Sequence, residues 1–369
     1  MTIARQWPAL DGLRGVAILL VIPHNVDRFG AVSAWTRPAA MVAHMGWIGV
    51  QLFFVLSGFL ITRNLLDSRG STHYYSSFFA RRALRILPLY VVTMLFLLVL
   101  LPRLTTLDPA ITATYGHQIW YWLFLNNWVQ TSGRGVYWLP HFWSLAVEEQ
   151  FYLVWPFVVA WVAPRRFVPV CAAIALAAIL ARGVMFADGA PALSIYEFTI
   201  CRMDALAIGA IAAMVLDASW WAAWSQRRGT ILLAAAAGVL AVTALATRGL
   251  DAADPAMSVV GFTPLAASFA LLVLVATVPG AGTFAAATRR VLSGGPIRSV
   301  GRYSYAMYVL HQPIALAADR PLLAWLEPTG SLRPILFAAI IVAASYGAAY
   351  ISYHVLEKHA LALKRWFPP

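Results

Sequence analysis

Charged residues are scarce in this sequence of 369 residues, of which they make up 11%. Soluble domains usually carry about 25%. Hydrophobic residues account for 61%, and the mean hydropathy is +0.73. This composition is that of an integral membrane protein. No linker, repeat or low-complexity tract interrupts the chain, so we expect a single membrane domain over residues 1–369.

Cysteine is nearly absent, and acidic residues are few. Cys171 and Cys201 lie in apolar segments without CxxC spacing, which excludes a disulfide framework and a zinc site. We therefore expect no metal and no bound cofactor. The 15 acidic residues against 27 lysines and arginines leave a net charge of +12. In a soluble chain that charge would suggest nucleic acid, but in a membrane protein basic residues mark the cytoplasmic loops, so nucleic acid is not an expected partner.

Ten apolar windows are long enough to cross a bilayer. They are 9–29, 45–63, 84–101, 142–162, 168–187, 201–216, 230–246, 258–278, 303–318 and 335–356. The predicted fold is an all-α polytopic bundle of about ten transmembrane helices. The apolar and aromatic segment 118–130 is too short to span and is followed by glycines, which predicts a re-entrant or interfacial piece.

The basic residues fit ten crossings with both termini in the cytoplasm. On that assumption 18 of the 27 lysines and arginines fall on the cytoplasmic side, as the positive-inside rule requires. They are Arg5, Arg14, Arg63, Arg69, Arg81, Arg82, Arg85, Arg165, Arg166, Arg227, Arg228, Arg289, Arg290, Arg298, Arg302, Lys358, Lys364 and Arg365. Counting 118–130 as an eleventh span would move Arg165 and Arg166 outside and break the pattern.

The first apolar window contains Arg14 and, ten residues later, His24. A charged side chain at a bilayer centre costs about 2.5 to 3.5 kcal/mol on insertion scales, so such a residue indicates a functional site. Ten helical residues span roughly 15 Å, about half of a hydrocarbon core. One helix therefore carries a cation near one interface and a proton acceptor deep inside.

Arg82 and Arg85 are i, i+3 neighbours at the cytoplasmic end of the third window. Two guanidinium groups on one helix face are suited to binding a phosphate. The alternative is that both arginines only anchor the helix at the lipid headgroups.

The stretch from His141 to Tyr152 places His141, Ser144, Glu148 and Tyr152 at helical spacing, which predicts one shared polar face. Glu148 and Glu149 are adjacent and cannot both point into one dry pocket. At least one of them should face water, pair with a cation or hold its proton. The alternative is that both lie in water at the outer interface.

Polar side chains are also predicted to be buried at two further places. Arg202 and Asp204, at the start of one window, are expected to form an internal charge pair with a structural role. His311 is a second imidazole in an apolar segment, and a lone histidine of this kind is more often a packing residue than a catalyst.

Taken together, the motifs resemble the acyltransferase family 3 of integral membrane O-acyltransferases. They are Leu10-Asp11-Gly12-Leu13-Arg14-Gly15 with His24, the run from Phe53 to Phe59, Arg82-x-x-Arg85 with Ile86-Leu87-Pro88-Leu89-Tyr90, Trp143-Ser144-Leu145 leading to Glu148-Glu149-Gln150-Phe151-Tyr152, and Tyr303-Ser304-Tyr305 leading to His311. Their order is that of the family, and they span almost the whole chain. Many members add an extra helix and an extracytoplasmic esterase-like domain, whereas here we expect the membrane domain alone.

The resemblance implies a cytoplasmic acyl-CoA donor, for example acetyl-CoA, and an acceptor hydroxyl on a cell-surface glycan, a lipid-linked sugar or a small glycosylated metabolite. The catalytic residues expected are His24 as general base and Glu148 or Glu149 as the group that holds its imidazole. The expected substrate-binding residues are Asp11, Arg14, Arg82, Arg85, Ser144, Tyr152 and His311. Arg14, Arg82 and Arg85 would bind the donor phosphates, and Asp11 would orient Arg14. Direct transfer and an acyl-histidine intermediate both stay open.

The competing function is that of a transporter or flippase for a polar or lipid-linked substrate, in which intramembrane charges line a path. No inverted repeat and no pair of broken helices favours it. A purely structural membrane protein would leave His24 and the glutamates without a role. We expect acyl-CoA, the acceptor and membrane lipid as partners in a bacterial inner membrane, and a homo-oligomer stays open.

Overall fold

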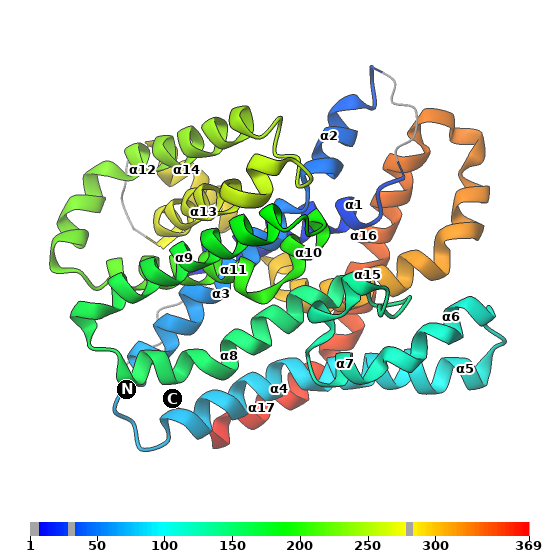
Figure 1. Ribbon diagram of the computed structural model, residues 1–369, viewed down its shortest axis with the longest axis horizontal. Coiled ribbons are helices and arrows are strands. Elements are labelled where there is room, and N and C mark those ends of the chain that lie inside the picture. The colour runs from blue at the N-terminus through cyan, green and yellow to red at the C-terminus, as the bar shows by residue number, and fades with distance from the viewer. Residues whose placement is uncertain (1–6, 29–33, 278–282, 369) are drawn as a thin grey trace.

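The computed structural model describes residues 7–28, 34–277 and 283–368, and every element in these ranges is a helix (Figure 1). The α-helices are α1 (Pro8–Asn25), α2 (Arg37–Met45), α3 (Ile48–Asp67), α4 (Tyr74–Leu95), α5 (Leu101–Leu104), α6 (Pro109–Ala113), α7 (Gln118–Trp122), α8 (Trp143–Trp161), α9 (Pro164–Ala187), α10 (Ala192–Glu197), α11 (Thr199–Val215), α12 (Ser219–Ala246), α13 (Phe262–Thr277), α14 (Thr283–Leu292), α15 (Gly295–Trp325), α16 (Arg333–Ser352) and α17 (Lys358–Ala362). Shorter 3-10 and π segments are η1 (Phe96–Leu100), η2 (Thr114–His117), η3 (Asn126–Trp128), η4 (Gln130–Ser132), η5 (Pro140–Phe142), η6 (Met257–Gly261), η7 (Glu327–Leu332), η8 (Tyr353–Glu357) and η9 (Leu363–Trp366). The predicted all-α fold is confirmed.

Each of the ten predicted windows lies largely within a helix, but fewer helices are both long and apolar enough to span by themselves. Six stretches in the described ranges meet that test: Ile48–Asp67, Tyr74–Leu104, Pro164–Ala187, Arg228–Ala246, Met257–Thr277 and Glu327–Trp366. A bent pair beginning with α11 would be a seventh. The count of ten stays a prediction. Arg5, Phe29, Val278 and the side chain of Arg227 lie outside the described residues.

Helices α1, α8 and α15 are not among the six apolar stretches, because they carry ionisable and polar side chains. They nevertheless lie inside the bundle, where α1 packs against α15 and α3, and α3 packs against α8 and α11. Of the apolar stretches, Pro164–Ala187, Arg228–Ala246 and Glu327–Trp366 are mostly exposed, whereas Ile48–Asp67 and Met257–Thr277 are mostly buried in the bundle.

Glycines let the inner helices approach closely. A Cβ atom at Gly301 of α15 would lie 1.7 Å from the Asp11 carbonyl oxygen of α1. A Cβ atom at Gly58 of α3 would lie 2.0 Å from the Leu206 carbonyl oxygen of α11. Small residues at such crossings permit backbone contact between membrane helices. These contacts fix α1 and α3 relative to the rest of the bundle.

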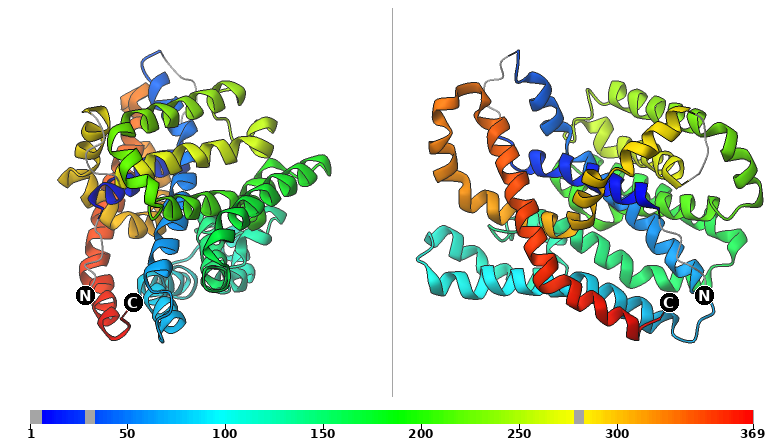
Figure 2. Two further views of the ribbon diagram at one scale, coloured as in Figure 1. Left: turned by 90° about the vertical axis from the view of Figure 1, so that its left-hand side faces the viewer. Right: turned by 180° about the vertical axis from the view of Figure 1, so that it is seen from behind.

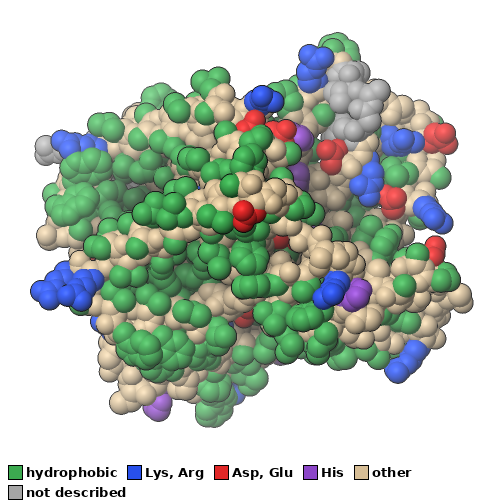
Figure 3. Space-filling model, in the orientation of Figure 1, with side chains coloured by type: hydrophobic (Ala, Val, Ile, Leu, Met, Phe, Trp, Pro, Cys, Tyr) green, Lys and Arg blue, Asp and Glu red, His purple; other side chains and the backbone are tan. Residues whose placement is uncertain are grey.

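The outer surface has an apolar middle and charged ends. In the face shown in Figure 3, hydrophobic side chains cover the middle of the molecule, while basic groups gather at its left edge and mixed charges at its right edge. Exposed apolar residues of this kind include Leu153, Val154, Leu176, Leu180, Val184, Ile231 and Val242. This is the surface of an integral membrane protein.

The short segment after α6 does not form a spanning helix. Its pieces are α7, η3, η4 and η5, none longer than five residues. Asn127 of η3 donates to Thr199 Oγ1 at 2.7 Å, and Gln130 of η4 donates to Glu197 Oε1 at 3.2 Å. Glu197 is buried, and burial raises its pKa to about 8, which the hydrogen bond from Gln130 opposes only in part.

The predicted pair between Arg202 and Asp204 is wrong. Asp204 accepts from Arg182 of α9 at 2.9 Å and from Thr263 of α13. Arg202 donates to Gln51 of α3 and lies over the ring of Phe262, with its guanidinium carbon 4.2 Å from the ring centroid. Residues two apart on a helix point to different sides, so each one finds its partner on another helix.

Candidate active site

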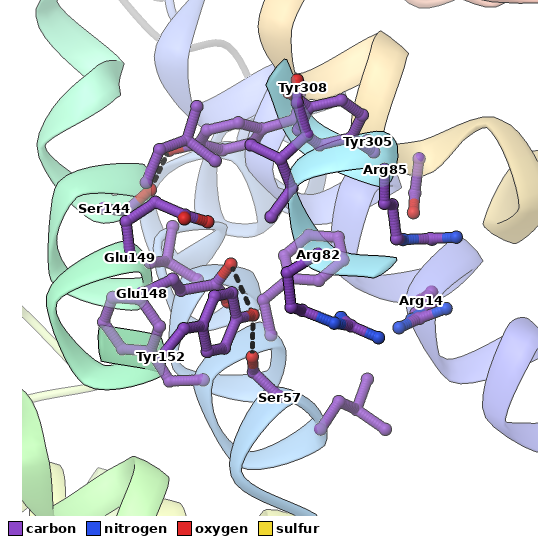
Figure 4. Close-up of a pocket in the computed structure, with 17 residues that line it drawn as sticks. Arg14, Ser57, Arg82, Arg85, Ser144, Glu148, Glu149, Tyr152, Tyr305 and Tyr308 are labelled. Atoms are coloured by element: carbon purple, nitrogen blue, oxygen red, sulfur yellow. Dashed lines mark hydrogen bonds between the residues drawn. The ribbon is translucent and has the colours of Figure 1, made fainter. Parts of the chain in front are cut away.

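A cavity lies between α1, α3, α4, α8 and α15 (Figure 4). Its polar lining is Arg14, Ser57, Arg82, Arg85, Ser144, Glu148, Glu149, Tyr152, Ser304, Tyr305 and Tyr308, and its apolar lining is Val50, Phe53, Phe54, Leu56, Leu145 and Ile86. Seven of the predicted site residues therefore meet in one place although they come from three helices. They are Arg14, Arg82, Arg85, Ser144, Glu148, Glu149 and Tyr152.

Three arginines form one side of this cavity. Arg82 and Arg85 project from the same face of α4, and Arg14 enters from α1 (Figure 4). The Arg82 guanidinium carbon lies 5.9 Å from the centroid of the Tyr152 ring. Among the described residues, no carboxylate oxygen lies within 4.0 Å of these guanidinium groups. The cations are therefore available to an anionic ligand.

The opposite side of the cavity carries Glu148 and Tyr152 of α8, with Ser57 of α3 beside them (Figure 4). The Tyr152 hydroxyl donates to Glu148 Oε2 at 3.3 Å and is also hydrogen-bonded to Ser57. Because the phenol has one proton, the Ser57 hydroxyl is the donor in that second bond. The i, i+4 spacing explains why Ser144, Glu148 and Tyr152 share this face.

His141 was expected on the same face, and that prediction is wrong. It belongs to η5 before α8 begins, and its ring does not line the cavity. Its Nε2 donates to the Val309 carbonyl at 3.3 Å. The helical spacing did not apply because the backbone ahead of Trp143 follows a 3-10 path.

Asp11 lies one turn before Arg14 on α1 and does not line the cavity. Its charge acts on the Arg14 guanidinium, but no hydrogen bond or ion pair within 4.0 Å joins the two in the part of the chain that is described. Orientation of Arg14 by a direct contact with Asp11 is thus not seen.

His24 lies farther along α1, outside the cavity lining. Its Nδ1 is 3.0 Å from the Ala43 carbonyl oxygen, at the end of α2. A carbonyl only accepts, so Nδ1 carries the proton and Nε2 of the neutral ring has the free lone pair. The predicted glutamate partner is therefore replaced by a backbone carbonyl, which fixes the same tautomer that a carboxylate would.

His311 is fully buried, and both of its ring nitrogens are engaged. Nδ1 donates to the Tyr308 carbonyl at 2.6 Å, and Nε2 accepts from the Asn25 amide at 2.9 Å. The ring lies edge-to-face with His141, with centroids 4.6 Å apart. His311 therefore does not face the cavity. It links Tyr308, in the cavity wall, to Asn25, which follows His24 on α1.

Sequence reasoning missed Ser57, Tyr305 and Tyr308 as cavity residues. Tyr308 donates to the His141 carbonyl at 2.8 Å and accepts from Ser144 at 2.6 Å, so it connects α15 to α8. All three residues stand inside runs that carry the family resemblance, but single hydroxyl groups in apolar runs do not stand out without the neighbouring helices.

Comparison with known proteins shows the family of this chain. A family model described as an acyltransferase domain matches residues 7–354. The chain belongs to this acyltransferase family. It is thus an enzyme of the acyltransferase class, and the resemblance inferred from the motifs is confirmed.

Several curated relatives of this acyltransferase are peptidoglycan O-acetyltransferases by name. The putative peptidoglycan O-acetyltransferase YrhL of Bacillus subtilis is 28% identical over 96% of this chain and 55% of its own length. The peptidoglycan O-acetyltransferase OatA of Listeria monocytogenes is 26% identical over 95% of this chain and 55% of its own. The O-acetyltransferase OatA of Staphylococcus aureus is 28% identical over 84% of this chain and 51% of its own length. The chain thus spans about half the length of these relatives, and no solved structure matches it.

Proposed function

We propose that this acyltransferase moves an acyl group, in the simplest case acetyl, from cytoplasmic acyl-CoA to a hydroxyl of a cell-surface glycan or its lipid-linked precursor. A small glycosylated metabolite is a further acceptor of the same chemistry. The observation that carries the proposal is the cavity in which Arg14, Arg82 and Arg85 meet and, within the described part of the chain, form no ion pair with a carboxylate. The relatives named for peptidoglycan acetylation support a glycan acceptor.

Arg14, Arg82 and Arg85 are proposed to bind the donor phosphates. One planar guanidinium group can donate two parallel hydrogen bonds to two phosphate oxygens. Such charge-assisted hydrogen bonds are roughly twice as strong as those between neutral groups. Arg14 and His24 are separated by roughly 15 Å along α1. That separation suits an extended pantetheine arm running from the phosphate site to the reacting thioester.

His24 is proposed as the general base. Its Nε2 takes the proton of the acceptor hydroxyl, the oxygen attacks the thioester carbonyl carbon, and the carbon–sulfur bond breaks. The imidazolium then returns the proton to the departing CoA thiolate, so the products are an ester and free CoA. The Ala43 carbonyl keeps Nδ1 protonated, as this role requires.

Glu148 with Tyr152 is proposed to hold the arginine side of the cavity in its working geometry. The Glu148 carboxylate and the Tyr152 ring face Arg82 across the cavity, where they limit how far its guanidinium can move. Glu149 lines the same cavity and adds a second acidic group opposite the cations. Neither glutamate contacts His24, so their contribution is to donor binding.

The orientation proposed has both termini in the cytoplasm of a bacterial inner membrane. It is supported by the excess of basic residues on that side. The donor arginines then face the pool of acyl-CoA, and His24 lies toward the opposite surface, where glycan acceptors are found.

The proposal is tested with the purified protein in detergent. Acetyl-CoA labelled with carbon-14 in the acetyl group is mixed with muramyl glycan fragments, and both free CoA and labelled glycan are measured. We expect the two products to appear in equal amounts and only when protein, donor and glycan are all present. Release of CoA without labelled glycan would contradict the glycan acceptor, and absence of both would contradict the donor.

A further inference from the structure

The C-terminal helices lie against the donor side of the bundle. Helix α17 and the turn η9 run alongside α4, as both views of the ribbon show (Figures 1 and 2). Arg81 of α4 donates to the Phe367 carbonyl at 3.2 Å, which ties the last turn to the start of α4. This contact brings a segment from the end of the sequence next to the predicted phosphate site.

Lys364 of η9 is half-buried in this contact. It lies close enough to Arg81, Arg82 and Arg85 for their positive charges to act on its ammonium group. Arg82 and Arg85 line the cavity, whereas Arg81 and Lys364 do not. Lys364 therefore extends the group of cations beyond the residues that line the cavity.

Acidic side chains lie near these cations without forming ion pairs with them. Glu148 and Glu149 act electrostatically on Arg82, and Arg85 acts on Glu357. Among residues 7–28, 34–277 and 283–368, no carboxylate oxygen lies within 4.0 Å of the charged nitrogens of Arg81, Arg82, Arg85 or Lys364. Glu357, which precedes α17, accepts from the Ser352 hydroxyl at 2.9 Å. Four like charges close together repel one another, and these unpaired carboxylates leave each cation free to bind a phosphate that would relieve the repulsion.

We infer that Lys364 is a further phosphate-binding residue of the donor site, and this inference rests on the proposed function. Coenzyme A carries a diphosphate and a ribose 3′-phosphate, about four negative charges in total at neutral pH. Arg14, Arg82 and Arg85 hold the phosphates nearest the cavity, and Lys364 binds the phosphate that lies outside it. Lys364 acts through charge and hydrogen bonding to the nucleotide and takes no part in proton transfer.

The test compares Lys364→Gln with Lys358→Gln, an exposed lysine of the same terminal segment. Both changes remove one positive charge and leave an uncharged polar side chain of similar length. Acetyl-CoA affinity is measured by calorimetry at low salt, with the protein in nanodiscs of zwitterionic lipid. We expect Lys364→Gln to weaken donor binding about tenfold, as the loss of one charge-assisted contact implies, and Lys358→Gln to change it less than twofold.

Shortened donors locate the phosphate. Acetyl-pantetheine, which has no phosphates, should bind wild type and Lys364→Gln equally. Dephospho-acetyl-CoA has no 3′-phosphate. If Lys364 binds that phosphate, wild type and Lys364→Gln should bind this donor with equal affinity. If Lys364 binds the diphosphate, the difference in affinity between the two proteins should remain. Lys364→Arg keeps the charge and should stay within about threefold of wild type, which separates loss of charge from damage to the fold.

Three outcomes would overturn the inference. Equal acetyl-CoA affinity of the two glutamine variants would show that Lys364 binds no donor phosphate. In nanodiscs with anionic lipid, a lipid-binding change in Lys364→Gln with unchanged donor affinity would assign the residue to a lipid headgroup. No binding of acetyl-CoA by the wild-type protein would overturn the proposed donor itself and this inference with it.

Discussion

At the scale of residues, the decisive features are ionisable side chains placed where hydrocarbon would normally be. Arg14 and His24 were predicted as functional from their cost in a bilayer, and the structure puts Arg14 in the cavity and gives His24 a single defined tautomer. The atom that orients His24 belongs to another helix, 19 residues along the chain. The Ala43 carbonyl that orients His24 leaves no trace in a sequence, because any residue has a carbonyl.

Exchange of Arg82 and Arg85 for lysine separates a phosphate site from a membrane anchor. Lysine keeps the charge and loses the paired donors, so we expect acetyl-CoA affinity to fall by about 10- to 100-fold in Arg82→Lys, Arg85→Lys. Calorimetry gives the affinity, and Arg165→Lys, Arg166→Lys at exposed positions is the matched control. An affinity equal to that of the control would mean that the two arginines only anchor α4.

The helical spacing predicted correctly which residues of α8 share a face. The same spacing gave a wrong prediction for His141, which precedes the start of α8. Ser144, Glu148 and Tyr152 meet as expected from i, i+4 spacing, but His141 lies in a 3-10 turn and points elsewhere. The Arg202 and Asp204 pair failed for a related reason, since its two members face different helices.

At the scale of helices, close contacts between glycines and carbonyls hold the polar inner helices in place. The crossing of α1 and α15 matters most for function, because α1 carries Arg14 and His24 while α15 carries Tyr308 and His311. The contact at Gly301 leaves no room for a methyl group. Sequence alone placed Gly58 in a motif and did not single out Gly301, and it did not tell which helix either glycine meets.

Gly301→Ala tests this crossing. Its Cβ atom would meet the Asp11 carbonyl oxygen at 1.7 Å, so α1 must shift, and we expect a loss of about 1 to 3 kcal/mol with a lower thermal midpoint. Gly347→Ala on α16 is the control, because its Cβ atom would have no heavy atom within 4 Å. Thermal unfolding in detergent measures both. Equal midpoints for the two variants would refute the close packing of α1 and α15.

The segment from α7 to η5 carries a pH-dependent contribution to stability through Glu197. The pKa of Glu197 is about 8 in the folded protein and 4.5 for a free side chain, so folding takes up a proton between these values. Stability should therefore fall as pH rises from about 5 to 8. Glu197→Gln should remove about 1 to 3 kcal/mol of that pH dependence.

Thermal midpoints of wild type and Glu197→Gln, measured across this pH range, test the assignment. The quantity compared is the difference between the two proteins, since other groups titrate equally in both. A difference that stays constant with pH would show that Glu197 is ionised in the fold.

At the scale of the whole molecule, hydropathy and the distribution of arginines predicted an all-helical membrane protein. They did not fix the number of crossings, because α1, α8 and α15 contain the polar residues that make the site and so fail a test of apolarity. What identifies these helices as inner ones is their packing, which depends on every other helix in the bundle.

The orientation of the bundle can be measured by cysteine labelling. Thr72→Cys, between α3 and α4, and Ser331→Cys, in η7, are placed singly in a protein lacking Cys171 and Cys201. We expect an impermeant maleimide to label Ser331→Cys in intact cells and Thr72→Cys only after permeabilisation. Labelling of Thr72→Cys in intact cells would place the arginines on the side without acyl-CoA.

The central claim is that His24 transfers acyl groups from a donor held by the arginine cavity, and a single-turnover assay of His24→Ala tests it most directly. The purified variant and wild type are mixed with labelled acetyl-CoA and muramyl glycan, and labelled glycan is counted. Loss of a general base typically lowers the rate by about 100- to 10,000-fold, while donor affinity should stay unchanged. His44→Ala, an exposed histidine next to the Ala43 carbonyl, should keep its rate. A His24→Ala rate within threefold of wild type would contradict the account.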